Sequence, residues 1–340
     1  MARIAGAVLM VMALGVAGPA CSSSSDTPPK AKAAAAVTLP FPRIVVPAGA
    51  EKTECVVMRL GNIAPVHVGA IHNTLGPGSH HLIVYRVSDT VEQRTPFECQ
   101  PFTDTLDPTK GSPIMVTQKQ DDLLTLPSGV AFSLEANQMM RLEMHYVNPT
   151  RSERTIDATT EIIPISDDDF RDEADFLFIG NPDIRIAPKS TFTLGPTYFE
   201  LPSEFNGVKF FAMTGHEHQY GTNVQVAAAT SREEPGTMVY DVPNWTWSEP
   251  KTEVFPTPFT LSNTGGFKFT CSWNNTSDRQ VRFGESANAE MCFFWAYYYP
   301  SQGAKVCFHT TQSGAPEGID ICCPGHSLCL LIQDFLDRSK

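Results

Sequence analysis

Short apolar stretches, separated by polar turns that contain Gly, Pro, Asn or Asp, make up most of the chain. The stretches are rich in branched and aromatic residues, which is the pattern of β-strands bounded by turns. Strands are expected at 55–60, 81–87, 139–147, 160–165, 191–194, 208–213, 225–228, 267–273 and 291–299. Helical periodicity is limited to one short helix expected at 328–336. Many short strands without alternating helices predict an all-β protein built from sandwiches or jelly rolls.

A different apolar pattern opens the chain. Arg3 is followed by an apolar run from Ile4 to about Ala17 and then by Gly18-Pro19-Ala20-Cys21, a combination typical of a secretory signal. The cysteine after small residues resembles a bacterial lipoprotein signal, in which Cys21 becomes the lipidated first residue. Ordinary cleavage near Cys21 is the alternative. We therefore expect residues 1–20 to be a signal peptide and the protein to be exported to the bacterial cell envelope, in the periplasm or at the outer membrane.

Composition divides the rest of the chain. Residues 21–37 hold serines, prolines and an alanine run, and such a segment buries too little apolar surface to fold, so it is expected to be a tether. About 300 residues remain, more than one domain usually holds. The most turn-like interval near the middle begins at Pro182. We expect an N-terminal domain at 38–182, a C-terminal domain at 183–300 and a Cys-rich tail at 301–340.

The charge balance excludes some partners. The chain has 25 basic and 37 acidic residues, and Arg3 is the one charged residue within 1–20. Removal of residues 1–20 therefore leaves 24 basic residues and a net charge of −13. That balance argues against nucleic acid and against an electrostatic grip on anionic lipid. No later apolar stretch is long enough to span a bilayer. Membrane contact is therefore expected only through an N-terminal lipid.

Nine cysteines are present, and eight remain if Cys21 carries a lipid. An even number in an exported protein indicates disulfides. The last four form a cluster near the C-terminus: Cys307, Cys322, Cys323 and Cys329. A disulfide between the adjacent Cys322 and Cys323 is geometrically poor, which leaves two pairings of the cluster open. A metal site that also uses His309 and His326 is the alternative for this cluster.

Imidazole pairs mark two expected strand ends. His216 and His218 follow the apolar run 208–213, and side chains two apart on a strand point to one face, where two imidazoles could hold a metal. His80 and His81 follow a Gly-Pro-Gly-Ser turn. Neighbours on a regular strand point to opposite faces, so these two could share a metal only where the backbone leaves regular geometry at the strand start.

Two further residues are candidate metal ligands only when they are considered together with the histidine pairs. His145 is a lone histidine in the expected strand 139–147, and alone it is more typical of a structural residue. Met291, at the start of the expected strand 291–299, alone is more typical of core packing.

The order of these six residues, with their flanking sequence, resembles the copper type II, ascorbate-dependent monooxygenases. This family includes peptidylglycine α-hydroxylating monooxygenase and dopamine β-monooxygenase. The resemblance covers nearly all of residues 50–300. The flanking segments that carry it are Cys55-x-x-x-Arg59-Leu60, 126–132, 269–275, 283–286 and 290–292.

The resemblance implies two jelly-roll sandwich domains that face each other across a solvent-filled cleft. It implies that the first copper is held in the first domain by His80, His81 and His145. It implies that the second copper is held in the second domain by His216, His218 and Met291. It also implies two disulfides, Cys55–Cys99 and Cys271–Cys292.

The ligand types agree with copper. Three imidazoles suit a copper that cycles between two oxidation states, and a soft thioether favours Cu(I). Zinc is a competitor at the three-histidine set, because such sets also form catalytic zinc sites. The reaction that the resemblance implies is that of an oxidoreductase, a dicopper monooxygenase. It inserts one oxygen atom of O2 into a C–H bond of a small organic substrate, with ascorbate or a similar one-electron reductant as co-substrate.

The resemblance places O2 activation at the second copper, with His216, His218 and Met291 as the catalytic residues, and electron storage at the first. Glu217 is expected to point to the opposite face of its strand and to take no part.

Departures from the family pattern bear on the substrate. Peptide-acting members carry an arginine two residues before the first ligand of the His-x-His pair, and Thr214 stands there in this chain. The asparagine and tyrosine that follow the methionine in those enzymes are replaced by Phe293 and Trp295. An uncharged or aromatic substrate is therefore expected. The alternative functions are an exported copper-binding lipoprotein without oxygenase activity, and a carbohydrate- or protein-binding jelly roll with vestigial histidines.

Overall fold

The computed structural model describes residues 32–99, 110–261, 265–284, 286–312 and 314–329. Its regular structure is almost entirely β, which confirms the expected all-β class. The described residues contain no helix that is long and apolar enough to cross a membrane. The expected signal peptide, Cys21 and most of the expected tether and C-terminal helix lie outside the described residues.

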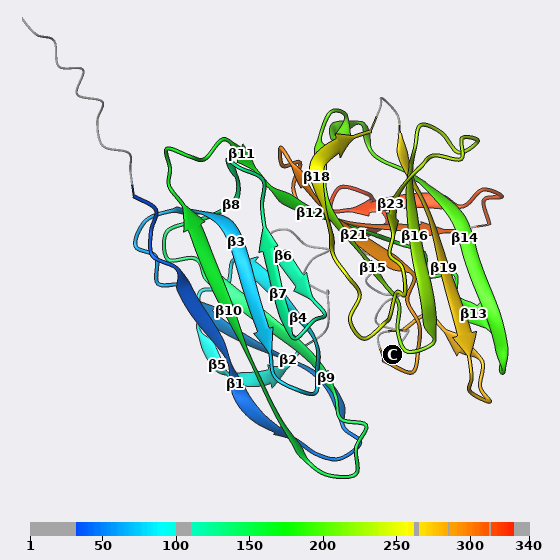
Figure 1. The fold of residues 1–340 in the computed structure, drawn as a ribbon, viewed down its shortest axis with the longest axis horizontal. Coiled ribbons are helices and arrows are strands. Elements are labelled where there is room, and N and C mark those ends of the chain that lie inside the picture. Colours follow the sequence, from blue (N-terminus) through cyan, green and yellow to red (C-terminus); the bar gives the residue numbers. More distant parts are fainter. Residues whose placement is uncertain (1–31, 100–109, 262–264, 285, 313, 330–340) are drawn as a thin grey trace, which may run out of the picture. The chain divides into compact units, whose positions relative to one another are not determined.

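The first half of the fold is a sandwich of two sheets, drawn from blue to green in Figure 1. One sheet has the strand order β1-β10-β3-β8-β11, with β7 paired to β3, and the other has the order β5-β2-β9-β4-β6. The strands are β1 (Val37–Val46), β2 (Glu51–Arg59), β3 (Val66–Leu75), β4 (Ser79–Val87), β5 (Gln93–Glu98), β6 (Gly111–Thr117), β7 (Asp121–Thr125), β8 (Val130–Leu134), β9 (Met139–Val147), β10 (Arg154–Ile165) and β11 (Asp172–Glu173).

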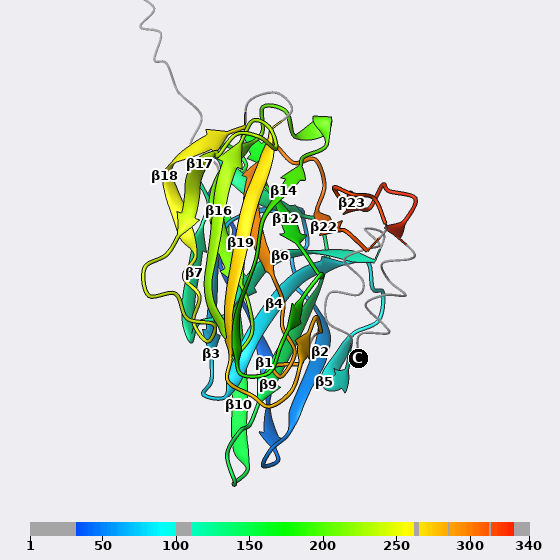
Figure 2. The ribbon, with the colours of Figure 1, turned by 90° about the vertical axis from the view of Figure 1, so that its right-hand side faces the viewer.

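The second half is a sandwich of a six-stranded sheet, order β18-β15-β21-β12-β22-β23, and a four-stranded sheet, order β14-β19-β16-β17. Figure 2 shows the strands of the smaller sheet beside one another. The elements are β12 (Asp175–Gly180), β13 (Arg185–Ile186), β14 (Ser190–Glu200), the short 3-10 helix η2 (Ser203–Phe205), β15 (Lys209–His216), β16 (Gly221–Ala229), β17 (Thr237–Asp241), β18 (Glu253–Thr260), β19 (Gly266–Asn275), β20 (Val281–Arg282), β21 (Phe293–Tyr299), β22 (Lys305–Thr310) and β23 (Ile319–Cys323). The two-residue strands β13 and β20 pair with each other.

The chain passes from one sandwich to the other between Glu173 and Asp175. β11 pairs with β8 of the first sandwich, whereas β12 lies between β21 and β22 of the second. The partly buried guanidinium of Arg86 binds both carboxylates at the crossing, Glu173 at 2.8 Å and Asp175 at 3.1 Å. The change of sheet therefore comes a few residues before the boundary expected at 182–183, because the apolar strand 175–180 is built into the second sandwich.

The segment expected to be a separate tail is partly built into the second sandwich as well. β22 runs parallel to β12, and β23 pairs with β22 at the edge of the same sheet. The carboxylate of Asp183 accepts hydrogen bonds from Thr310, Thr311 and Gln312 and so fastens the end of β22.

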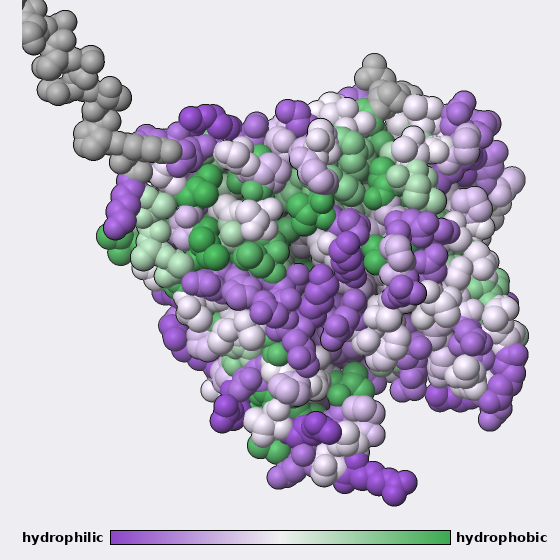
Figure 3. Space-filling view, in the orientation of Figure 1, coloured by the Kyte–Doolittle hydropathy of each residue, from purple (hydrophilic) through white to green (hydrophobic). Residues whose placement is uncertain are grey.

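Aromatic side chains dominate the core of the second sandwich. Trp273, Trp295, Tyr297 and Tyr298 are all almost fully buried. Burying one such side chain stabilises a fold by roughly 1.5–3 kcal/mol. The hydroxyl of Tyr297 also accepts a 3.2 Å hydrogen bond from the backbone N–H of Val116, so it links the two halves. Apolar residues that reach the surface are interspersed with hydrophilic ones on the face shown in Figure 3.

Four disulfides join the cysteines of the described residues. Two are the pairs that the resemblance implies, Cys55–Cys99 and Cys271–Cys292. The tail cluster, for which two pairings were open, forms Cys307–Cys322 and Cys323–Cys329. The alternative of a tail metal site is wrong, because all four sulfurs are in disulfides and His309 hydrogen-bonds Asp320 at 2.7 Å instead.

Candidate metal centre

Three imidazoles meet where β4 begins and β9 ends. In the pairing of these strands His81 lies opposite His145, and the register is irregular between Ser79 and His81. This irregularity turns the side chain of His80 to the same side as that of His81, which a regular strand would not allow. One ring nitrogen from each of His80, His81 and His145 lies within 4.8 Å of the others.

The three rings fit a metal ion. His80 Nδ1 and His81 Nδ1 are 3.1 Å apart. Two nitrogens at this separation can both bind the same metal ion, each at about 2.0 Å. The Nε2 atoms of both rings are buried and have no hydrogen-bond partner among the described residues. Burial, reinforced by the neighbouring imidazoles, holds the pKa of His80 and of His81 well below the usual value. The two rings are therefore neutral at neutral pH, which is the form that binds metal.

A carboxylate orients the third ring. His145 Nε2 lies 3.1 Å from Glu51 Oε1, so the nitrogen left for a metal is Nδ1. Metal-binding histidines commonly donate their other N–H to a carboxylate in this way. Burial alone raises the pKa of Glu51, but hydrogen bonds from His145 and Ala287 lower it overall, so the carboxylate is ionised at neutral pH.

A second imidazole pair stands at the end of β15. The centroids of the His216 and His218 rings are 5.1 Å apart. His216 Nδ1 lies 3.2 Å from Gln118 Oε1, and His218 Nδ1 donates to the carbonyl of Ala289 at 3.2 Å. In each ring the nitrogen left for a metal is Nε2. Burial lowers the pKa of His218 to about 4 and that of His216 well below its usual value.

Met291 lies two residues before the start of β21, between residues that contact this pair. The carboxylate of Glu290 accepts the backbone N–H of His218 at 2.8 Å. On the other side, Phe293 lies opposite His216 in the pairing of β21 with β15. Met291 is itself buried. The role of its thioether as the third ligand of this pair remains a prediction.

Glu217, between the two histidines, points away from them. Its Oε1 accepts the backbone N–H of Ser272 in β19 at 2.9 Å, on the smaller sheet of the sandwich. Burial and the neighbouring Glu290 raise the pKa of Glu217 well above the usual value. This placement agrees with its exclusion from the candidate ligands.

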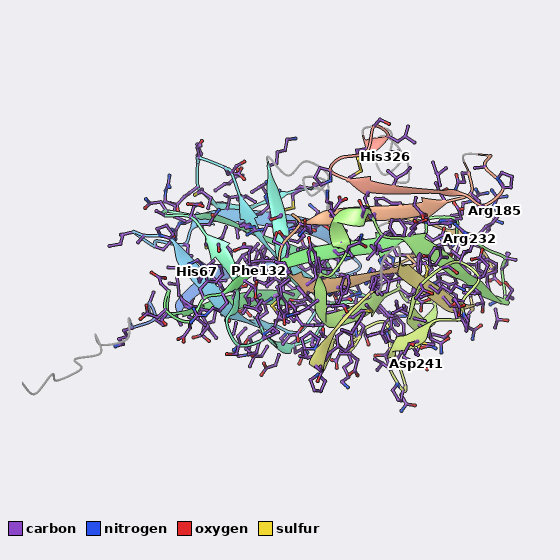
Figure 4. The ribbon with its side chains drawn as sticks, turned by 90° about the horizontal axis from the view of Figure 1, so that it is seen from above. His67, Phe132, Arg185, Arg232, Asp241 and His326 are labelled. Carbon is purple, nitrogen blue, oxygen red and sulfur yellow. A yellow bond between two sulfur atoms is a disulfide. The ribbon has the colours of Figure 1, made fainter. Side chains whose placement is uncertain are left out.

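The two sets of imidazoles form one five-histidine cluster: His80, His81, His145, His216 and His218. Ring centroids are 6.4 Å apart both from His80 to His218 and from His81 to His216. None of the five residues is more than 9% exposed. The arrangement is tighter at this point than the solvent-filled cleft implied by the resemblance. His67, which stacks on Phe170, and the exposed His326 stand outside the cluster (Figure 4).

Three residues around the cluster had no signal in the sequence. Glu51 and Gln118 bind ring nitrogens of His145 and His216. The ring of Trp247, in the loop between β17 and β18 of the second sandwich, lies 5.2 Å from that of His80 in the first. Each of the three reaches the cluster from a distant part of the chain, which no local pattern reveals.

Residues 174–317 match the family model described as "Copper type II ascorbate-dependent monooxygenase, C-terminal domain". This part of the chain belongs to the copper type II, ascorbate-dependent monooxygenase family. The match begins where β12 enters the second sandwich, and it contains His216, His218, Met291 and the Cys271–Cys292 disulfide. It confirms, for the second sandwich, the family resemblance drawn from the sequence. The three-histidine group of the first sandwich lies outside the matched range.

Other comparisons add no functional information about this copper type II monooxygenase domain. No curated protein matches the chain. The major capsid protein P2 from bacteriophage PM2 is 10% identical with a TM-score of 0.29, and the alignment covers 77% of this chain and 100% of that one. A peptide-N(4)-(N-acetyl-β-D-glucosaminyl) asparagine amidase is 9% identical with a TM-score of 0.30, covering 77% and 94%. Similarities this low carry no conclusion about activity.

Proposed function

We propose that the protein is an exported copper-dependent monooxygenase. It hydroxylates a C–H bond of a small organic substrate with O2 and a one-electron reductant such as ascorbate. One observation carries the proposal: a group of three imidazoles, with ring nitrogens within 4.8 Å of one another, adjoins a second pair that lies in a domain of the copper monooxygenase family.

The proposal assigns two copper ions to the cluster. The first is held by His80, His81 and His145, and the second by His216, His218 and Met291. Copper bound at these sites supplies one-electron redox chemistry and activation of O2, with the thioether favouring the reduced ion.

The chain's own residues supply position and environment. Glu51, Gln118 and the carbonyl of Ala289 each occupy one nitrogen of a ring, which leaves the other nitrogen for metal. Burial keeps the rings of His80, His81, His216 and His218 neutral. It also limits the access of bulk water to all five rings.

Aromatic neighbours support an uncharged substrate. The ring centroids of Trp295 and His216 are 6.0 Å apart, and Thr214 lies opposite Trp295 in the pairing of β15 with β21. The Thr214 hydroxyl is 2.8 Å from that of Thr252. Threonine carries no positive charge, so this position cannot form an ion pair with the carboxylate of a peptide. We therefore propose an uncharged or aromatic substrate rather than a peptide carboxylate.

The disulfides support an exported location. Four disulfides are typical of proteins that fold outside the reducing cytosol. The proposed lipid anchor rests on Cys21 alone, which lies outside the described residues.

The test is elemental analysis of the purified protein followed by an oxygen-electrode assay with ascorbate and a panel of compounds. Two copper ions per chain, and ascorbate-dependent O2 uptake coupled to a hydroxylated product, are expected. Copper without coupled O2 uptake would instead identify a copper-binding protein. The absence of stoichiometric copper would favour a binding jelly roll, and zinc at the three-histidine set would overturn the copper assignment there. Efficient turnover of glycine-extended peptides would contradict the substrate class.

A further inference from the structure

The carboxylate of Glu51 contacts both sandwiches at once. It lies at the start of β2 in the first sandwich, and its Oε1 is 3.1 Å from His145 Nε2. The same oxygen accepts the backbone N–H of Ala287 in the second sandwich at 2.7 Å. Its Oε2 is 3.2 Å from the hydroxyl of Ser286. One side chain therefore joins a histidine of the first set to the loop that precedes β21.

That loop holds the second pair. The carbonyl of Ala289 accepts from His218 Nδ1 at 3.2 Å, and the carboxylate of Glu290 accepts from the backbone N–H of His218 at 2.8 Å. The loop is closed on itself by a 2.8 Å hydrogen bond from the N–H of Ala289 to the carbonyl of Ser286. A displacement of residues 286–287 is thus transmitted directly to the ring and the backbone of His218.

We propose that Glu51 is a positioning residue for both histidine sets, which orients the ring of His145 and docks the 286–290 loop that orients His218. The expected effect of Glu51 on copper binding rests on the proposed function, because the two oriented rings are the proposed ligands of different copper ions. Loss of Glu51 therefore weakens both sites, although the residue lies in only one sandwich.

The first test uses the full-length protein without metal and follows hydrogen exchange in peptides that cover 286–291. Glu51→Ala and Glu51→Asp, whose shorter side chain cannot reach both partners, are expected to speed exchange about tenfold there. Glu51→Gln keeps a carbonyl oxygen at the contact and is expected to stay close to wild type. Because Glu51→Asp is a mild change, it decides the matter even if Glu51→Ala folds poorly. Exchange equal to wild type in both shortened variants overturns the proposal.

Glu54 provides the matched control. It lies on the same strand and accepts a 3.0 Å hydrogen bond from the hydroxyl of Tyr146. Within the described part of the chain, no hydrogen bond or ion pair joins Glu54 to the loop at 286–290. Glu54→Ala is expected to leave exchange in that loop unchanged. If Glu54→Ala accelerated loop exchange as much as Glu51→Ala, the effect would be a general loosening of β2 and the proposal would fail.

The second test measures Cu(I) affinity by chelator competition in a His80→Ala/His81→Ala background, where only the second site remains. Adding Glu51→Ala is expected to lower the affinity of that site roughly tenfold, within the range for residues that orient ligands. Unchanged affinity would mean that Glu51 serves only His145, and the two-site proposal would be overturned. If the wild-type protein bound no copper, the proposed function would fail, while the exchange experiment would still decide the role of Glu51.

Discussion

The indole N–H of Trp273 donates a 2.8 Å hydrogen bond to Glu290 Oε2, and the same carboxylate accepts the backbone N–H groups of His218 and Tyr220, each at 2.8 Å. Trp273 lies in β19 of the smaller sheet, whereas His218 follows β15 of the larger one. A single buried carboxylate therefore ties the His-x-His segment to the opposite sheet of its sandwich. It also immediately precedes Met291, the proposed third ligand.

Glu290→Ala is expected to destabilise the protein by roughly 3 kcal/mol or more, because three N–H groups, two of them buried, lose their acceptor together. Urea denaturation measures the change in the free energy of unfolding. Glu290→Gln keeps one carbonyl acceptor and is expected to cost distinctly less. Equal losses in the two variants would contradict a hydrogen-bonding role and leave only packing.

Met291→Ile is expected to abolish hydroxylation while it changes the stability by less than about 1.5 kcal/mol, because the two side chains have similar volume. Isoleucine has no thioether to favour the reduced ion. Thermal denaturation and product analysis with ascorbate measure the two effects. Turnover that survives this change would show that residue 291 is not a ligand.

His145→Ala is expected to remove copper from the first site and leave the second loaded. The change deletes one of three imidazoles and frees the carboxylate of Glu51 from its ring partner. Elemental analysis should then give one copper ion per chain, and O2 uptake should no longer be coupled efficiently to product. Retention of two ions per chain would contradict the assigned ligand set.

Replacement of Cys271 and Cys292 by serine is expected to lower the free energy of unfolding by about 3 kcal/mol, from the 21-residue loop that this disulfide closes. The loss should be accompanied by weaker copper binding at the second site, because Cys292 is adjacent to Met291. The Cys323–Cys329 bridge is the control, since its separation of 6 residues predicts a smaller loss of about 2 kcal/mol and no effect on copper. Calorimetry and copper titration compare the two double variants.

Asp183→Asn is expected to lower stability at neutral pH by about 1–2 kcal/mol, because an amide cannot accept all of the hydrogen bonds from Thr310, Thr311 and Gln312. Burial alone raises the pKa of Asp183, but these hydrogen bonds lower it overall below its usual value of 3.8. A lowered pKa in the folded state means that this stabilisation is present above pH 3.8 and is lost as the pH falls through the folded value. Denaturation at pH 7 and near pH 3 should therefore show the difference between variant and wild type shrinking in acid. A difference that is independent of pH would contradict the role of the charge.

Local patterns in the sequence predicted nine of the strands. The strand expected at 139–147 coincides with β9, and each of the other expected strands overlaps an observed one. The strand expected at 191–194 is the start of the longer β14, Ser190–Glu200, because the register shifts between Leu194 and Thr197 and interrupts the alternation. Strand alternation is a property of adjacent residues, so it can be read without the fold.

The sequence by itself also determined the candidate ligand groups, which are imidazoles at five positions and a thioether at Met291. Their order along the chain indicated the family. It could not determine which distant side chains meet. The shared face of His80 and His81 depends on the irregular register of β4 against β9, and the tail pairing depends on β22 lying beside β23. Contact of Glu51 with Ala287 depends on the packing of one sandwich against the other. Only the tertiary structure decided these, because sheet register and the packing of sheets are set by contacts between residues far apart in the chain.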